Sequence, residues 1–156
     1  MSKVRPIPEG YHTVTPYLHV RHAARAIDFY TRAFGAELLL RLDMPDGTRV
    51  MHAEMRIGDS VVMLADESHE MGTPSPETLG GASGSLLIYV ENVDAAFQRA
   101  IDAGATQLAA PADMFWGDRF CKVQDPFGQR WALATHIEDV TPEECERRAQ
   151  QIFKQP

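Results

Sequence analysis

At 156 residues, the chain is long enough for one domain or for two half-size modules that share a core. Its formal net charge of −7 argues against a nucleic-acid partner, because phosphates are bound by basic surfaces. The sequence has no apolar run near the roughly 20 residues that cross a membrane, no signal-peptide pattern at its start and no CxxC pair, so we expect a cytoplasmic protein.

The first half of the chain predicts a strand, a helix and three further strands. Pro6 and Pro8 discourage helix in the lead-in, which we expect to be extended. Gly35 suits the left-handed position that follows the last turn of a helix. The expected elements are a strand over 14–20, a helix over about 23–34, and strands over 37–44, 50–57 and 60–65.

The second half repeats this order. The pattern of VRHAARAIDFYTRAFG (20–35) recurs in VENVDAAFQRAIDAG (90–104). Each copy runs from a strand into a helix that ends at glycine. A duplicated module predicts a pseudo-symmetric fold with a site where the halves face each other. The expected elements are a strand over 85–90, a helix over 93–103, and strands over 106–109, about 119–123 and 130–135, with the turn DPFG at 125–128.

We therefore assign residues 1–156 to a single domain of two βαβββ modules, at 14–66 and 85–136. The connector over 67–84 is rich in Gly, Pro, Ser and Thr, which is typical of a linker or a mobile flap. A capping box that begins at Thr141 predicts a separate helix over 141–153. The expected fold class is α+β, with curved mixed sheets around a cavity and a C-terminal helix.

Strand alternation separates an apolar face from a polar one. In residues 50–57, Met51, Ala53, Met55 and Ile57 share one face, and His52, Glu54 and Arg56 share the other. We expect the helices to cover the apolar face. The other face then carries hydroxyl, aromatic, imidazole and carboxylate groups, which suits a ligand.

The duplication, together with IDFY at 27–30, Gly35-Ala36 and DPFG at 125–128, resembles the vicinal oxygen chelate superfamily. This group includes glyoxalase I, bleomycin-resistance proteins, fosfomycin-resistance enzymes and extradiol dioxygenases. The segments over 51–66, 115–119 and 125–144 look like its PhnB-like, glyoxalase-like branch. The resemblance covers nearly the whole chain and implies a homodimer that binds a small molecule in a cavity between the modules.

Members of this superfamily usually bind a divalent metal through one ligand from each of four strands. The resemblance places these positions at Thr15, Met63, Ser85 and Ala132, and none of these side chains suits zinc, nickel or manganese. We therefore expect no metal and no other cofactor. This departure argues against glyoxalase I, fosfomycin-transferase and dioxygenase activity, because each of these reactions depends on the metal.

His52 and Glu54 are the candidate catalytic pair. They stand on one face, two residues apart. A buried carboxyl group whose pKa is raised towards neutral pH can act as a base. They can equally serve structure through hydrogen bonds. A third alternative is a non-standard metal site completed by His19 or His136.

The candidate ligand-binding residues are aromatic or basic: Tyr17, His19, Tyr89, Trp116 and Arg119. Tyrosine and tryptophan rings offer stacking surfaces, and an arginine can clamp an anion. The alternative is that Trp116 closes the end of a barrel while Asp118 and Arg119 form a local ion pair.

Two function classes follow. The first is a small-molecule binding protein of the bleomycin-resistance type that needs no metal and whose ligand the sequence does not identify. The second is a lyase or isomerase in which Glu54 is the general base and His52 or Arg119 stabilises charge, with or without a non-standard metal site.

Overall fold

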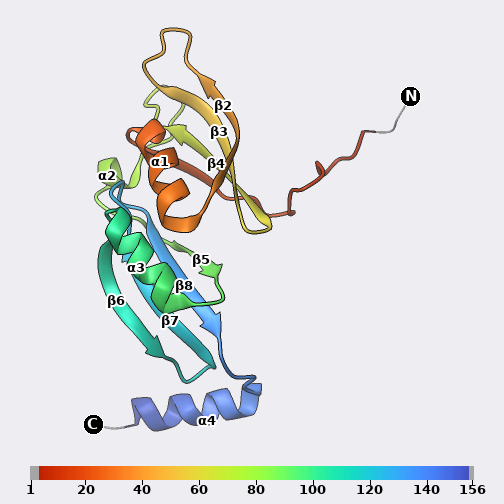
Figure 1. The fold of residues 1–156 in the computed structure, drawn as a ribbon, viewed down its shortest axis with the longest axis vertical. Helices are drawn as coiled ribbons and strands as arrows, with labels where there is room; N and C mark the ends of the chain where they lie inside the picture. Colours follow the sequence, from red (N-terminus) through yellow and green to blue (C-terminus); the bar gives the residue numbers. More distant parts are fainter. Residues whose placement is uncertain (1–3, 155–156) are drawn as a thin grey trace. The chain divides into compact units, whose positions relative to one another are not determined.

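The structure is a computed structural model that describes residues 4–154 and divides into two compact units (Figure 1). Unit 1 contains the chain up to Ser83 together with residues 126–129, and unit 2 contains residues 84–125 and the chain from Arg130 onward. Each unit has one four-stranded sheet, so the α+β class is confirmed. The single domain over 1–156 stays a prediction, and residues 1–3 and 155–156 lie outside the described range.

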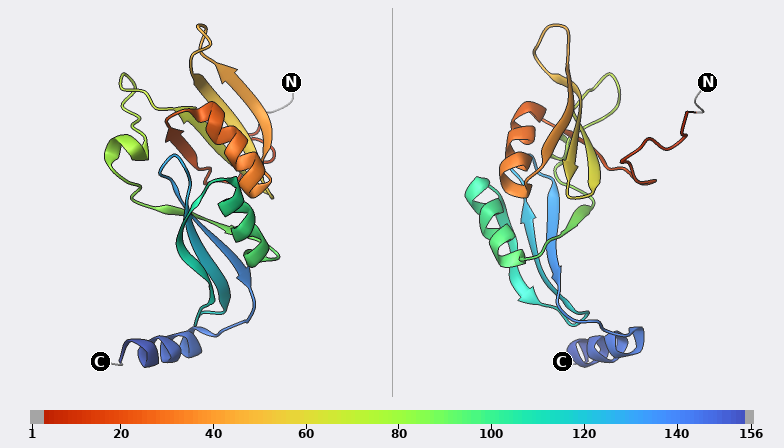
Figure 2. Two further views of the ribbon diagram at one scale, coloured as in Figure 1. Left: turned by 60° about the vertical axis from the view of Figure 1, so that its left-hand side comes forward. Right: turned by 45° about the vertical axis from the view of Figure 1, so that its right-hand side comes forward.

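Unit 1 has the predicted βαβββ order. Its elements are β1 (Tyr17–Val20), α1 (Ala23–Phe34), β2 (Glu37–Asp43), β3 (Val50–Ile57), β4 (Ser60–Asp66) and the short α2 (Pro76–Leu79). The strands lie in the order β1-β4-β3-β2, with β1 parallel to β4 and the other neighbours antiparallel. Helix α1 lies along one face of this sheet (Figure 2).

The apolar face of β3 packs beneath α1 because its alternate residues are hydrophobic. Ala53, Met55 and Ile57 are buried, and so is the face of α1 that carries Ile27 and Tyr30. At the start of β3 the predicted alternation is wrong, since Val50 is buried and Met51 is half exposed. The β2–β3 register shifts between Leu42 and Asp43, and such a bulge reverses which residue faces the core.

The first strand is shorter than predicted. It begins at Tyr17, because Pro16 has no N–H group with which to extend the ladder. The Pro16 carbonyl still accepts a hydrogen bond from the Met63 N–H at 2.8 Å. Val14, predicted to lie in the strand, is 82% exposed.

The connector contains an ordered helix that the sequence analysis did not predict. Ser75 caps the start of α2 by accepting a hydrogen bond from the Thr78 N–H. The Glu67 carboxylate accepts bonds from the Ser75 N–H at 2.8 Å and the Thr78 hydroxyl at 2.6 Å. These bonds attach the connector to the end of β4.

Unit 2 repeats the topology of unit 1. Its elements are β5 (Ser85–Tyr89), α3 (Val93–Ala103), β6 (Thr106–Asp113), β7 (Asp118–Gln124), β8 (Arg130–His136) and α4 (Pro142–Phe153). The strands lie in the order β5-β8-β7-β6, again with one parallel pair. The two predicted modules and the C-terminal helix are therefore confirmed. None of the helices in residues 4–154 has the length and apolar character needed to cross a membrane.

The duplication is visible in equivalent hydrogen bonds. In unit 1, the Asp66 carboxylate at the end of β4 accepts from the Ala23 N–H at 2.9 Å, at the first position of α1. In unit 2, the Thr135 hydroxyl near the end of β8 accepts from the Val93 N–H at 2.9 Å, at the first position of α3. Each module thus fixes its helix from the last strand of its own sheet.

The DPFG turn at 125–128 joins β7 to β8, as predicted, and Pro126–Gln129 belong to unit 1. There the Phe127 ring packs edge-on against Phe29 of α1, with 6.2 Å between ring centroids. Phe127 is buried. Unit 1 therefore completes its core with a side chain from late in the sequence.

The backbone at Gly117, in the turn between β6 and β7, leaves no room for a side chain, and a substitution tests this. Its φ is +101°, and an added Cβ would overlap the Glu138 carbonyl oxygen. We expect Gly117→Ala to lower the free energy of unfolding by about 3 kcal/mol, through strain and this overlap. Urea denaturation measures the loss. The matched control is Gly47→Ala, with φ +69° and no neighbour within 4 Å, which should cost about 1 kcal/mol; equal losses would contradict the overlap.

Candidate functional site

Four sequence-predicted residues come together on the face of the unit 1 sheet away from α1. Tyr17 in β1 and Glu54 in β3 lie on either side of Met63 in β4. His19 lies two residues after Tyr17 and His52 two residues before Glu54, so both lie on the same face. The structure thus groups Tyr17, His19, His52 and Glu54 in unit 1.

A chain of hydrogen bonds connects this group. The Tyr11 hydroxyl donates to Glu54 Oε2, and the other carboxylate oxygen lies 3.2 Å from His52 Nε2. The opposite ring nitrogen, His52 Nδ1, lies 3.0 Å from the Tyr17 hydroxyl. An ionised carboxylate only accepts, so a neutral His52 donates from Nε2 and accepts at Nδ1 from Tyr17.

The sequence analysis did not identify Tyr11. It lies in the lead-in, 43 residues from Glu54, and no local pattern links the two. Its position among prolines and glycine predicted only extended chain. Pairing between such distant segments is set by the tertiary structure.

Aromatic rings form the exposed surface of this group. The Tyr17 and His19 rings stack with centroids 4.7 Å apart, and Tyr17 meets His52 edge-on at 5.5 Å. Tyr17 is 46% exposed, whereas the side chains of His52 and Glu54 are only 22% and 18% exposed. A flat ring therefore faces solvent beside a partly covered polar chain.

Glu54 is held in its ionised form. The hydrogen bond from Tyr11 lowers the pKa of Glu54; burial opposes this, and His52 lowers it further. The same bond raises the pKa of Tyr11, and burial lowers the pKa of His19. The expectation that burial raises the Glu54 pKa towards neutrality is therefore wrong, because donors outweigh desolvation. Glu54 is a strong acceptor and a weak base.

Removal of the Tyr11 hydroxyl tests this electrostatic account. Tyr11→Phe should raise the pKa of Glu54 towards its ordinary value of 4.5, because the largest cause of the lowering is lost. A carbon-detected NMR titration of the carboxyl groups measures the change. Tyr17→Phe is the control, since that hydroxyl contacts His52 and not Glu54. An unchanged Glu54 pKa in Tyr11→Phe would contradict the assignment.

In unit 2, a buried carboxylate gathers two of the predicted ligand-binding residues. Asp118 is 4% exposed and accepts from the Trp116 indole N–H at 3.0 Å and the Tyr89 hydroxyl at 3.1 Å. His136 Nδ1 lies 2.8 Å from its other oxygen, and His136 Nε2 lies 2.9 Å from Asp139. Tyr89 and Trp116 are thus fixed by Asp118, which the sequence analysis treated only as an ion-pair partner.

Arg119 lies apart from this cluster. Its guanidinium forms a two-bond pair with Asp94 of α3, at 2.7 and 2.8 Å, and a further bond to Asp113 at 2.8 Å. The alternative of an Asp118–Arg119 ion pair is wrong, because adjacent strand residues point to opposite faces and Arg119 faces α3. With these partners, its guanidinium is already engaged by two carboxylates.

The charges around His136 and Asp118 are coupled. Asp139 and then Asp118 raise the pKa of His136 above its ordinary 6.5. Burial raises the pKa of Asp118, but the bonds from His136, Tyr89 and Trp116 outweigh it and the net shift is downward. This pair is therefore most stable when the imidazole is protonated and the carboxylate is ionised.

Stability should depend on pH through His136. A raised folded-state pKa adds stability that is fully present below about pH 6.5 and is lost as the pH rises through the higher folded value. As the pH rises above about 6.5, the urea midpoint of the native protein should therefore fall relative to that of His136→Gln, which has no titrating group at position 136. Urea midpoints of both proteins, taken at about pH 6 and about pH 8, measure the difference. An equal change of the urea midpoint in the two proteins between these pH values would refute the coupling.

The four positions where the superfamily holds its metal carry no suitable donor set. The Thr15 hydroxyl donates to the His12 carbonyl at 3.0 Å, and Met63 lies between Tyr17 and Glu54. In unit 2, Ser85 pairs with Arg130, and Ala132 pairs with Leu87. Thioether, methyl and hydroxyl groups do not fit zinc, nickel or manganese.

A metal held by His52 and Glu54 would need further ligands. Within residues 4–154, no group of three or more His, Cys, Asp or Glu side chains is arranged to hold a metal ion. His52 and Glu54 are bonded to each other instead. The residues present therefore do not fit a divalent metal at this face.

Comparison with known proteins decides the family. The family model of the glyoxalase/bleomycin resistance protein/dioxygenase superfamily matches residues 11–133. The chain belongs to this superfamily. Within it, an uncharacterized protein of Mycobacterium bovis is 43% identical over 136 residues, covering 85% of this chain and 89% of the relative.

Solved structures similar to this chain agree in fold. TioX from Micromonospora sp. ML1 is 30% identical, with a TM-score of 0.62 over 81% of this chain and 99% of TioX. The PhnB protein from Bacillus cereus is 19% identical, with a TM-score of 0.59 over 80% of this chain and 99% of that protein. At that identity the PhnB likeness shows the fold alone.

Proposed function

We propose that this superfamily member, of the PhnB-like branch, binds a small planar aromatic molecule on the unit 1 sheet face that carries Tyr17 and Glu54. The observation that carries the proposal is the hydrogen-bonded chain from Tyr11 through Glu54 and His52 to Tyr17. Such a chain links an exposed ring, through His52, to an ionised carboxylate on the same sheet face. The arrangement needs no metal and no other cofactor.

The chemistry of the site favours a ligand with a flat ring and a positive or hydrogen-bond-donating group. The Tyr17 ring, stacked on His19 and 46% exposed, supplies a surface for an aromatic ring. The lowered pKa of Glu54 keeps a negative charge beside it at neutral pH. A cation above the tyrosine ring would also be attracted by its electrons.

We extend the proposal to a homodimer in the cytoplasm, without a nucleic-acid or membrane partner. Four leucines of the edge strand β2 are between 40% and 46% exposed: Leu38, Leu39, Leu40 and Leu42. A second copy covering this strand would remove apolar surface and unpaired backbone groups from water. Cys121 and Cys145 are both free thiols, which supports a reducing compartment.

Proflavine, a planar fluorescent aromatic cation, tests the proposed site. Native protein should bind it saturably in a fluorescence titration. Glu54→Gln should weaken binding about tenfold by removing the charge, and Tyr17→Ala by a similar factor through loss of the stacking surface. The matched control is Glu91→Gln, an exposed carboxylate in unit 2, which should bind like the native protein. Absence of saturable binding, or equal binding by Glu54→Gln, would contradict the proposal.

Proton transfer by a lyase or isomerase is the second candidate. The specific observation in its favour is the same chain, in which His52 connects the Glu54 carboxylate to the Tyr17 hydroxyl and can relay a proton. The lowered Glu54 pKa makes that residue a weak base at neutral pH. A catalytic Glu54 predicts that Glu54→Gln retains ligand affinity and loses turnover, whereas a binding role predicts a change in affinity alone.

A further inference from the structure

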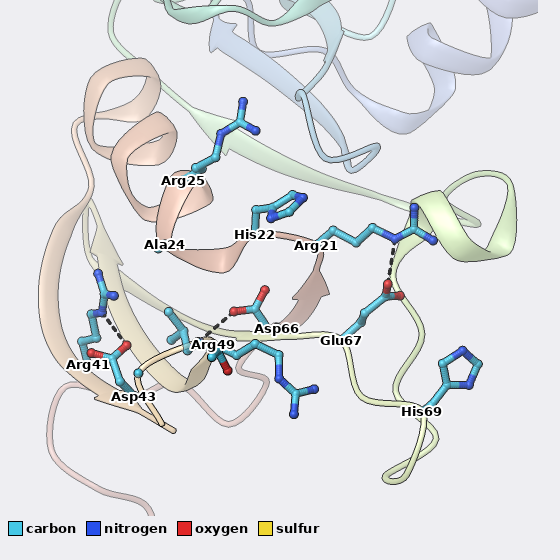
Figure 3. Close-up of a pocket in the computed structure, with 13 residues that line it drawn as sticks. Arg21, His22, Ala24, Arg25, Arg41, Asp43, Arg49, Asp66, Glu67 and His69 are labelled. Atoms are coloured by element: carbon cyan, nitrogen blue, oxygen red, sulfur yellow. Dashed lines mark hydrogen bonds and ion pairs between the residues drawn. The ribbon is translucent and has the colours of Figure 1, made fainter. Parts of the chain in front are cut away.

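Unit 1 contains a cavity of about 590 Å³ at the start of α1 (Figure 3). Its walls come from the first turn of α1, the turn between β2 and β3, and the chain that follows β4. Four arginines line it: Arg21, Arg25, Arg41 and Arg49. Three carboxylates lie in the same wall, so the charged side chains of the cavity leave a formal excess of one positive charge, in a chain whose formal net charge is −7.

The three carboxylates in the cavity wall are already engaged. Asp66 accepts from the N–H groups of Ala23 at 2.9 Å and Val50 at 2.7 Å. Glu67 binds the connector and Arg21, and the bond from Thr78 is the largest cause that lowers its pKa to about 2. Asp43 accepts from Arg41 at 2.9 Å, so these carboxylates leave two arginines without a partner.

In the described part of unit 1, the guanidinium groups of the remaining two arginines, Arg25 and Arg49, form no hydrogen bond or ion pair. Hydrogen bonds from Thr48 lower the pKa of Asp46, and Arg49 lies near enough for its charge to lower the pKa of that carboxyl group further. Figure 3 shows the side chains of Arg25 and Arg49 extending to opposite sides of His22. The first turn of α1 contains no acidic residue, and His22 does not cap it with its side chain. The Ala23 N–H is bonded to Asp66 and the Arg25 N–H to the His22 carbonyl, so the positive potential of the cavity comes mainly from its arginines.

From the cavity and these two guanidinium groups, we propose that unit 1 binds a small molecule with two anionic groups, phosphate or carboxylate, between Arg25 and Arg49. Each guanidinium can bind one such group through two parallel hydrogen bonds. The volume of about 590 Å³ accommodates a metabolite-sized molecule.

This anion site is separate from the aromatic site of the proposed function. Arg41 pairs across β2 and β3 with Ala53, whose side chain lies on the face covered by α1. Glu54, next in sequence, points to the opposite face. The two sites therefore lie on opposite sides of one sheet, and the failure of either leaves the other standing.

Isothermal titration with inorganic pyrophosphate and with succinate tests the anion site and distinguishes phosphate from carboxylate. Native protein should bind at least one of them saturably, and Arg25→Gln/Arg49→Gln should weaken that binding by at least about tenfold. Amide NMR signals of Ala24 and Thr48, in the cavity wall, should move during the same titration. Binding should weaken with added salt, as expected for exposed charges.

Arg5→Gln/Arg56→Gln is the matched control, because it removes the same charge from unit 1 outside the cavity. Its affinity should equal that of the native protein. Thermal unfolding should show the cavity variant folded, since neither guanidinium group forms a hydrogen bond in the described part of unit 1. Failure of both anions to bind, or equal loss of affinity in the two double variants, would overturn the proposal.

Discussion

The carboxylate of Asp66 is the contact on which the arrangement of unit 1 depends. One oxygen holds the first N–H of α1 and the other holds the N–H of Val50, at the start of β3. Asp66 itself ends β4, so one side chain joins a helix and two strands. The apolar residues of β3 set the face on which α1 packs, and the Asp66 contact fixes the start of that helix relative to β3 and β4. In unit 2 the Thr135 hydroxyl has the equivalent role for α3, accepting from the Val93 N–H and donating to the Val90 carbonyl.

Each of the two sheets carries a carboxylate that is hydrogen-bonded to a tyrosine and a histidine. Glu54 and Asp118 each accept from a tyrosine and lie against a histidine, and each is kept ionised by its donors. An ionised carboxylate with a lowered pKa holds its hydrogen-bond donors in position. The same lowered pKa makes it a weak base for catalysis. The same feature that makes these clusters well ordered therefore favours recognition of a ligand over proton abstraction.

Repetition and periodicity were enough to predict the order of helices and strands in the two modules, but not the short helix α2 in the connector. The helices at Ala23–Phe34 and Val93–Ala103 have their predicted bounds, since each has an apolar stripe and ends at glycine. Alternation also placed His52 and Glu54 on the correct face. Alternation could not identify hydrogen-bond and ion-pair partners. Tyr11 donates to Glu54 from a distant segment, and Arg119 pairs with Asp94 on a helix instead of with its neighbour Asp118. The bulge that buries Val50 depends on the register with β2, which one strand's own sequence does not encode.

The DPFG turn has a consequence for any attempt to divide the protein. A gene fragment that ends at Ser83 would encode every helix and strand of unit 1 and yet omit Phe127, leaving Phe29 without the ring packed against it. Because the polypeptide leaves unit 1, returns for four residues and leaves again, no single truncation yields an intact half. The first module therefore depends on a turn encoded within the second, and moving it alone into another protein would require a substitution that replaces the Phe127 ring.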